Sequence, residues 1–129
     1  MLRLILVASD GSAPSRRAFA MALGLAEPAG SALVLLHVTP SAARGEGLLG
    51  GLQEEAQGRG VVCRIEEVAG DPVERILARA GELDADLLVV GSRGRGAVAE
   101  EVLGRVSSGV LRHTQRPLLI VRASPALAG

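Results

Sequence analysis

Five short runs of aliphatic residues are spaced along the chain, and each is long enough for one β-strand. Segments whose apolar residues have helical spacing separate these runs. Strands that alternate with helices predict right-handed β-α-β crossovers, and therefore a parallel sheet covered by helices on both faces. The runs occupy residues 2–8, 32–38, 61–68, 86–90 and 117–121. We predict an α/β fold: an open, doubly wound, Rossmann-like sheet of five parallel strands in the order 3-2-1-4-5.

Helix boundaries are marked most clearly at the third helix. Asp71 is placed to cap it, Pro72 suits its first turn, and Glu74 follows the cap by three residues. Ser12 is the corresponding cap for the first helix. The second helix is predicted over residues 48–57. The fourth is predicted from an apolar stripe that extends over three turns and consists of Ala99, Val102, Leu103, Val106 and Val110.

Charge and composition exclude several classes of function. The 14 basic residues balance 14 acidic ones, so no overall field attracts nucleic acid or an anionic membrane. All the basic residues are arginine, which excludes a Schiff-base lysine and a Walker phosphate loop. No apolar run approaches the roughly 20 residues of a membrane span, and no signal-peptide cleavage pattern follows the first run. We expect one domain over residues 1–129, soluble and cytoplasmic.

A glycine-rich segment follows the fourth predicted strand, with the sequence Gly91-Ser92-Arg93-Gly94-Arg95-Gly96. Glycines allow positive φ and close approach of a ligand, and the next helix would present free N–H groups to an anion. Arginines add charge-assisted hydrogen bonds to phosphate. The alternative is an ordinary strand-to-helix loop with solvated arginines. The GxGxxA pattern from Gly94 to Ala99 does not indicate NAD or FAD, because the next strand lacks the acidic residue that would bind a ribose.

A longer spacing extends this segment: two residues separate Gly91 from Gly94, and nine separate Gly94 from Gly104. The G-x2-G-x9-G pattern after strand four resembles the nucleotide-binding signature of the universal stress protein family. The segments Ile5–Ser12, Ala85–Gly91 and Arg116–Val121 are also similar to that family. The chain therefore resembles a single-domain, UspA-type member over essentially its whole length.

The resemblance implies an adenine-nucleotide site at the carboxyl ends of the strands. In nucleotide-binding members, the aspartate after strand one lies beside the adenosine, a valine ending strand two contacts the base, and the glycine loop wraps the phosphates. ATP, with Mg²⁺ as a possible companion, is the implied cofactor. The matching positions and their neighbours are Ala8, Asp10, Val38, Gly91, Ser92, Arg93, Gly94, Gly104, Arg105, Val106 and Ser107.

Two of these positions have more than one interpretation. Asp10 is suited to accept from a base amine or to help hold a metal on phosphate, but it also suits a helix start, where its charge favours the dipole. Arg105 stands where the signature has Ser or Thr. Its guanidinium would either bind phosphate or fill the phosphate pocket. Ser107 and Ser108 are alternative sources of a hydroxyl.

Catalytic patterns are missing from the sequence, which has neither GxSxG nor HExxH. His37 is expected to be a polar residue at a strand end, and His113 to interact with a helix dipole. Cys63, the single cysteine, is expected to be a buried core thiol. No catalytic residue or bound metal is therefore assigned, and ATP hydrolysis is expected to be slow at most.

Three hypotheses of function remain. The first is a regulatory, ATP-binding module of the stress response. The second is a dimeric interaction protein of the same fold that binds no nucleotide, and the third is a nucleotide-dependent enzyme. The aliphatic run 117–121 lies at the predicted sheet edge and favours a homodimer. The alternative is that the fourth helix and the C-terminal tail cover this edge.

Overall fold

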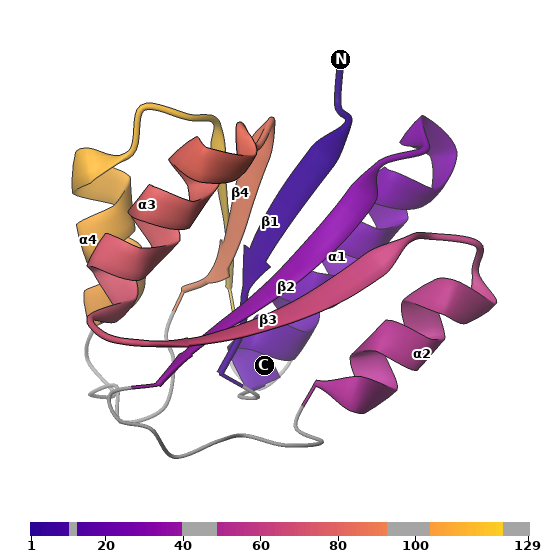
Figure 1. Cartoon of the computed structure of the whole chain (residues 1–129), viewed down its shortest axis with the longest axis horizontal. Coiled ribbons are helices and arrows are strands. Elements are labelled where there is room, and N and C mark those ends of the chain that lie inside the picture. The colour runs from indigo at the N-terminus through magenta and orange to yellow at the C-terminus, as the bar shows by residue number, and fades with distance from the viewer. Residues whose placement is uncertain (11–12, 40–48, 93–103, 123–129) are drawn as a thin grey trace, which may run out of the picture.

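The computed structural model describes residues 1–10, 13–39, 49–92 and 104–122. Helices and strands alternate along the described chain (Figure 1). In order they are β1 (Leu4–Ala8), α1 (Ala13–Ala29), β2 (Ala32–Thr39), α2 (Gly50–Gly58), β3 (Cys63–Ala69), α3 (Pro72–Leu83), β4 (Leu87–Gly91), α4 (Arg105–His113) and β5 (Leu118–Val121). Within these ranges, no helix combines the length and the apolar character that a membrane span requires.

The strands form one parallel sheet in the order β3-β2-β1-β4-β5, as predicted. β1 lies near the middle, with Ile5 paired to Leu33 of β2 on one side and to Leu87 of β4 on the other. The chain builds the sheet outward from β1 in both directions. The winding therefore reverses between β1 and β4.

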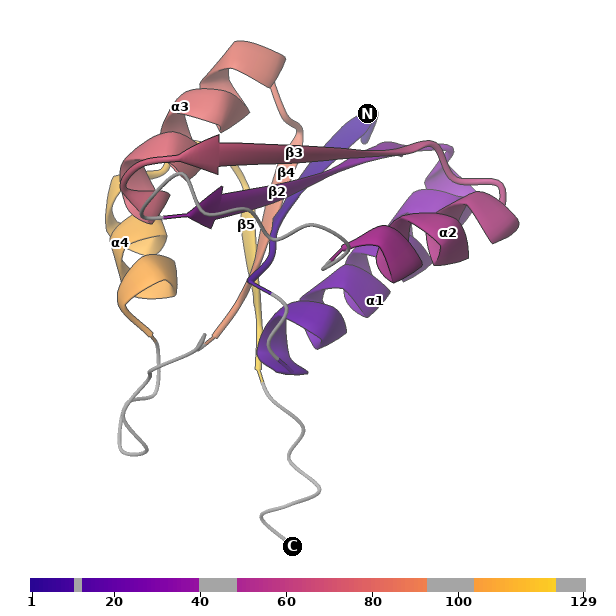
Figure 2. The same ribbon diagram turned by 60° about the horizontal axis from the view of Figure 1, so that its bottom comes forward.

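Helices cover both faces of the sheet (Figures 1 and 2): α1 and α2 lie on one face, and α3 and α4 on the other. The packing of β1 explains why its residues are all apolar and do not alternate with polar ones. Ile5 and Val7 pack with Phe19 and Leu23 of α1, whereas Leu6 packs with the cluster under α3 and α4. Both sides of this strand are therefore buried, as expected for a central parallel strand.

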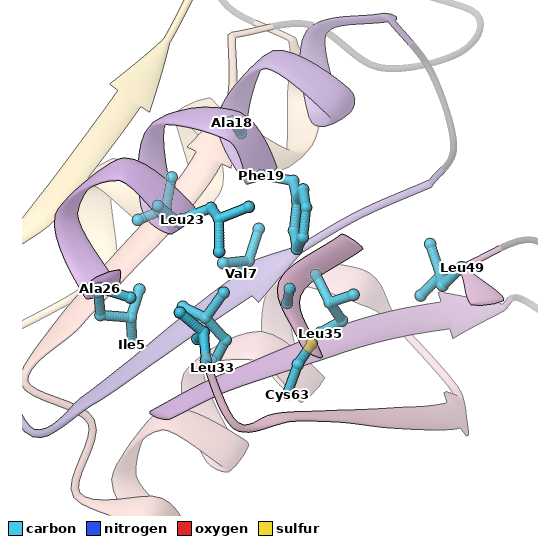
Figure 3. Close-up of a cluster of buried hydrophobic side chains, with 14 of the residues drawn as sticks. Ile5, Val7, Ala18, Phe19, Leu23, Ala26, Leu33, Leu35, Leu49 and Cys63 are labelled. Atoms are coloured by element: carbon cyan, nitrogen blue, oxygen red, sulfur yellow. The ribbon is translucent and has the colours of Figure 1, made fainter. Parts of the chain in front are cut away.

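Cys63 belongs to the cluster under α1 and α2, close to Leu33 and Leu35 in Figure 3. Its side chain is buried, which confirms the predicted core thiol. Burial also raises the pKa of the thiol to about 11, because the thiolate loses its solvation. Cys63 is therefore a packing residue.

The start of α3 follows the prediction closely. Asp71 Oδ2 accepts a hydrogen bond from the Glu74 backbone N–H at 3.0 Å, and Pro72 occupies the first turn. This side chain satisfies one of the N–H groups that a helix start leaves without an internal partner.

The prediction for the fourth helix was wrong at Gly104. The apolar stripe indicated a continuous helix through this residue, but Gly104 is the N-cap of α4, with an extended backbone at φ −77° and ψ 174°. Its N–H donates to the Ser92 carbonyl oxygen at the end of β4. A contact from outside the helix therefore sets where α4 begins. Residues 99–103 of the stripe, and Ser12, lie outside the described residues.

Candidate functional site

The carboxyl ends of β1 and β4 meet where the winding of the sheet reverses. Ser9 N–H donates to the Leu36 carbonyl at 2.9 Å, so β1 remains joined to β2 beyond its last residue. On the other side, Ser92 N–H donates to the Val121 carbonyl at 2.8 Å and joins the end of β4 to β5. β1 is followed by α1 on one face of the sheet and β4 by α4 on the other (Figure 2), and open α/β sheets bind ligands beyond the strand ends at such a point.

Three of the predicted site residues gather on one side of this edge. Ala8 ends β1, Val38 lies near the end of β2, and Val106 is in the first turn of α4. All three are partly buried against the apolar cluster under α3 and α4. Asp10 follows Ala8 by two residues and is half-buried. The topology thus places apolar side chains and a carboxylate at the same edge.

Arg93 and Gly94 were predicted to contact phosphate, but they lie outside the described residues. The two ends of their segment are described. Gly91 ends β4 and Ser92 follows it, and Gly104 is the N-cap of α4, which begins at Arg105.

Gly91 has a role in packing that the sequence did not predict. In the described part of the chain, the glycines with positive φ are Gly30, Gly60 and Gly70, and Gly91 is not among them. A Cβ at Gly91 would lie 2.8 Å from the carbonyl carbon of Pro14. The absent side chain therefore lets the first turn of α1 approach the end of β4. Sequence spacing did not reveal this contact, because it joins distant parts of the chain.

Two buried serines support the turn into α1. Ser9 Oγ donates to Ser15 Oγ at 3.2 Å, and both side chains are about 95% buried. Hydrogen bonding compensates such hydroxyls for the water they lose. Ser15 was not predicted as a site residue. The available signal was its place in the first turn of a helix that follows Asp10.

The start of α4 is held to the end of β4 by Ser92. Its carbonyl oxygen accepts from the Gly104 N–H and from Ser107 Oγ, the latter at 2.7 Å. Ser92 and Ser107 are both 2% exposed. Gly104, the N-cap residue, has no side chain with which to cap α4, and no side chain among the described residues takes its place. The first N–H groups of α4 are therefore suited to bind an anion from outside the helix.

Arg105 is the first residue of α4, and its side chain is exposed. Among the described residues it has no hydrogen-bond or ion-pair partner. The guanidinium is therefore not part of the packed interior. It stands beside the uncapped helix start as a positive charge.

A shallow hollow lies at the opposite, amino edge of the sheet. It is bordered by the last turns of α3 and α4 and by the residues before β4 and β5, including Ala80, Asp86, His113 and Arg116. Its charged groups already have partners: Asp86 accepts from the Arg3 and Leu4 N–H groups, which lower its pKa. Arg116 donates to Asp84 and to the Ala85 carbonyl. This hollow contains none of the predicted site residues. No cluster of metal-ligating side chains occurs in the described ranges.

Comparison with known proteins agrees with the fold. The sequence matches the universal stress protein family over residues 1–57 and 42–122. It is 34% identical to universal stress protein YxiE of Bacillus subtilis, across 95% of this chain and all of that protein. The chain belongs to the universal stress protein family.

Two solved structures are similar to it. A universal stress protein in complex with cAMP is 31% identical, with a TM-score of 0.79 over 95% of this chain and 98% of that one. A family member from Arabidopsis thaliana with AMP bound is 25% identical, with a TM-score of 0.77 over 96% and 93%. Members of this family with the same fold therefore bind adenine nucleotides.

Proposed function

We propose that this chain is a regulatory module of the stress response that binds ATP at the carboxyl edge of its sheet. The observation that carries the proposal is the reversal of winding between β1 and β4, together with the start of α4 beside the carboxyl end of β4. The relatives with cAMP and AMP bound support an adenine nucleotide. We take residues 1–129 as one domain that works in the cytoplasm.

The base and the phosphates would bind to different groups at the carboxyl ends of the strands. Ala8 and Val38 offer partly exposed apolar surface for the base, and Asp10 offers a carboxylate for the adenine amine or for Mg²⁺ on the phosphates. Phosphate would be bound by backbone N–H groups and by the remaining residues of the family signature. These are Gly91, Ser92, Arg93, Gly94, Gly104, Arg105 and Val106.

Arg105 decides between the two main hypotheses. An arginine that filled the pocket would have to be folded against the protein, whereas this side chain is exposed at the helix start. Its position favours a phosphate contact in place of the family's hydroxyl. The second hypothesis, a family member that binds no nucleotide, requires Arg105 to move inward.

Thermal unfolding with and without millimolar ATP and Mg²⁺ tests the proposal. A ligand at 100 times its dissociation constant adds about 2.7 kcal/mol to the stability of the native state. We expect the native protein to unfold at a higher temperature with ATP, and an Arg105→Ala variant to shift less. A shift that appears in Arg105→Ala and Arg105→Ser but not in the native protein would mean that the arginine closes the pocket. No shift in any of the three proteins would refute nucleotide binding.

A homodimer through β5 completes the proposal. β5 is the last strand of the sheet, and Leu118, Leu119 and Ile120 are only partly buried. Sedimentation of an Ile120→Arg variant tests this, because a charge at the edge opposes strand pairing. Val62→Arg is the control, since Val62 is 71% exposed and directly precedes β3, the strand at the opposite edge of the sheet. We expect Ile120→Arg alone to be monomeric, and a variant that sediments as the native protein does would contradict the β5 interface.

Hydrolysis of ATP is proposed to be slow at most. General-base catalysis needs a side chain within hydrogen-bond reach of the attacking water, with a pKa suited to the task. Asp10 is a carboxylate that the fold brings to the carboxyl ends of the strands, so Asp10→Ala is the informative variant. Steady product release that this substitution abolishes would favour the enzyme hypothesis instead.

A further inference from the structure

The hydroxyl of Ser107 has one proton to donate, and two backbone carbonyl oxygens lie within hydrogen-bond distance of it. Ser107 Oγ lies 2.7 Å from the Ser92 carbonyl oxygen and 3.2 Å from the Gly104 carbonyl oxygen. Carbonyl oxygens only accept, so the serine is the donor in both contacts. At 2% exposure, water scarcely competes with these hydrogen bonds. Ser107 is therefore already engaged within the protein.

Both hydrogen bonds to the Ser92 carbonyl come from the beginning of α4. One is donated by the Gly104 N–H and the other by Ser107 Oγ. Along the chain, residues 93–103 lie between Ser92 and Gly104. These hydrogen bonds thus join the two residues, Ser92 and Gly104, that flank residues 93–103. We call this set of contacts the Ser92–Gly104–Ser107 clamp.

We propose that Ser107 is a positioning residue, which holds the start of α4 against the end of β4 before any ligand arrives. The oxygen atoms of ATP phosphates accept hydrogen bonds, so Ser107 could donate to one only by giving up Ser92. The clamp instead sets where the free N–H groups of α4 stand relative to β4. The effect of the clamp on ATP affinity rests on the proposed nucleotide function, but the existence of the clamp does not depend on that function.

The first experiment measures the clamp in the protein without ligand. Hydrogen exchange of the Gly104 amide is followed by NMR in the native protein and in Ser107→Ala. We expect this amide to exchange about fivefold faster in the variant, which corresponds to the loss of one hydrogen bond. Ser107→Thr keeps a hydroxyl and should restore slow exchange. Ser31→Ala is the control and should match the native protein at Gly104, because it removes another buried serine hydroxyl, which donates to the Leu2 carbonyl at the amino end of the strands.

Unchanged exchange at Gly104 in Ser107→Ala would overturn the clamp. If the alanine variant does not fold, Ser107→Cys carries the same expectation, because a thiol has nearly the same shape and is a weak donor. Loss of the clamp should speed exchange at the Gly104 amide only. A general loss of stability would also speed exchange of the core amides in β1, so the two effects can be told apart.

The second experiment tests whether the clamp positions the site. Calorimetric titration with ATP should give about fivefold weaker binding for Ser107→Ala. Ser107→Thr should restore the affinity, and Ser31→Ala, far from the site, should bind as the native protein does. Faster exchange at Gly104 with native ATP affinity would overturn the positioning role. If the native protein binds no ATP while Ser107 still protects Gly104, the proposed function fails and the clamp remains.

Discussion

At the scale of single residues, Gly91 is the position where the smallest change has the clearest consequence. A Cβ there would meet the Pro14 backbone at 2.8 Å, and backbone cannot rotate away as a flexible side chain can. Gly91→Ala must therefore displace the first turn of α1 or the end of β4. We expect it to lower the free energy of unfolding by about 1–3 kcal/mol, as overpacking does, measured by urea unfolding.

Gly81→Ala is the matched control for this substitution. Gly81 lies inside α3, and a Cβ there meets nothing within 4 Å. Alanine is favoured over glycine within a helix, so this variant should be more stable by about 0.5–1 kcal/mol. Equal effects of the two substitutions would contradict the contact between Gly91 and Pro14.

Cys63 gives a second prediction at this scale. With a pKa of about 11, only about one thiol in a thousand is ionised at pH 8, and the thiolate is the reactive form. We expect a thiol reagent such as DTNB to label the native protein far more slowly than the unfolded protein at pH 8. The native rate should increase as the pH approaches 11. Equally fast labelling of both forms would contradict the burial of Cys63.

At the scale of elements, α3 is joined to β3 by a two-pronged ion pair. Arg79 Nε donates to Glu66 Oε1 at 2.6 Å, and Arg79 Nη2 donates to Glu66 Oε2 at 2.7 Å. The hydrogen bond from Arg79 lowers the pKa of Glu66 below its ordinary value of 4.5. A carboxyl with a lowered pKa in the folded state stabilises the protein above its unfolded pKa and loses this effect as the pH falls.

Glu66→Gln should therefore be less stable than the native protein by about 1 kcal/mol at neutral pH. The difference should persist down to about pH 4.5 and shrink below it, as Glu66 becomes protonated. Urea unfolding across this range measures it. Glu82→Gln is the control, because Glu82 is 64% exposed and contacts Arg79 at 3.2 Å through one nitrogen. A pH-independent difference for Glu66→Gln would contradict the ion pair.

α3 and α4 pack closely at Gly109, where a Cβ would lie 2.6 Å from Val73 Cγ2. Valine is branched at Cβ and has little freedom to turn away. We expect Gly109→Ala to destabilise the protein by about 1–3 kcal/mol. Val73→Ala removes the obstructing methyl groups. The double variant should therefore be less destabilised than the sum of the two single variants, and simple additivity in urea unfolding would contradict the close packing.

The starts of α3 and α4 show which helix boundaries could be predicted from the sequence. The start of α3 was predicted correctly because Asp71, Pro72 and Glu74 interact within one helical turn. The start of α4 was not, because Gly104 is fixed by a hydrogen bond to Ser92 on another element. The spacing of apolar residues predicts which face of a helix is buried, but it does not predict contacts with other parts of the chain.

At the scale of the whole molecule, the alternation of apolar strands and helices predicted a parallel sheet covered on both faces, whereas the order 3-2-1-4-5, which the structure has, is one of several that this alternation allows. That order brings Ala8 and Val38 to the same edge as Gly91, so part of the candidate site was also predictable. The contact of Pro14 with Gly91 and the Ser92–Gly104–Ser107 clamp were not. They depend on how the ends of α1 and α4 meet β4, which the spacing of residues in the sequence does not encode.

The central claim is that ATP binds at the carboxyl edge of the sheet. Hydrogen exchange by mass spectrometry, on protein with and without saturating ATP and Mg²⁺, tests it most directly. We predict slower exchange in peptides that cover residues 7–12, 36–40 and 91–107. Peptides from the hollow at the amino edge, residues 80–86 and 113–117, should not change. Protection confined to the amino edge, or no protection at all, would contradict the claim.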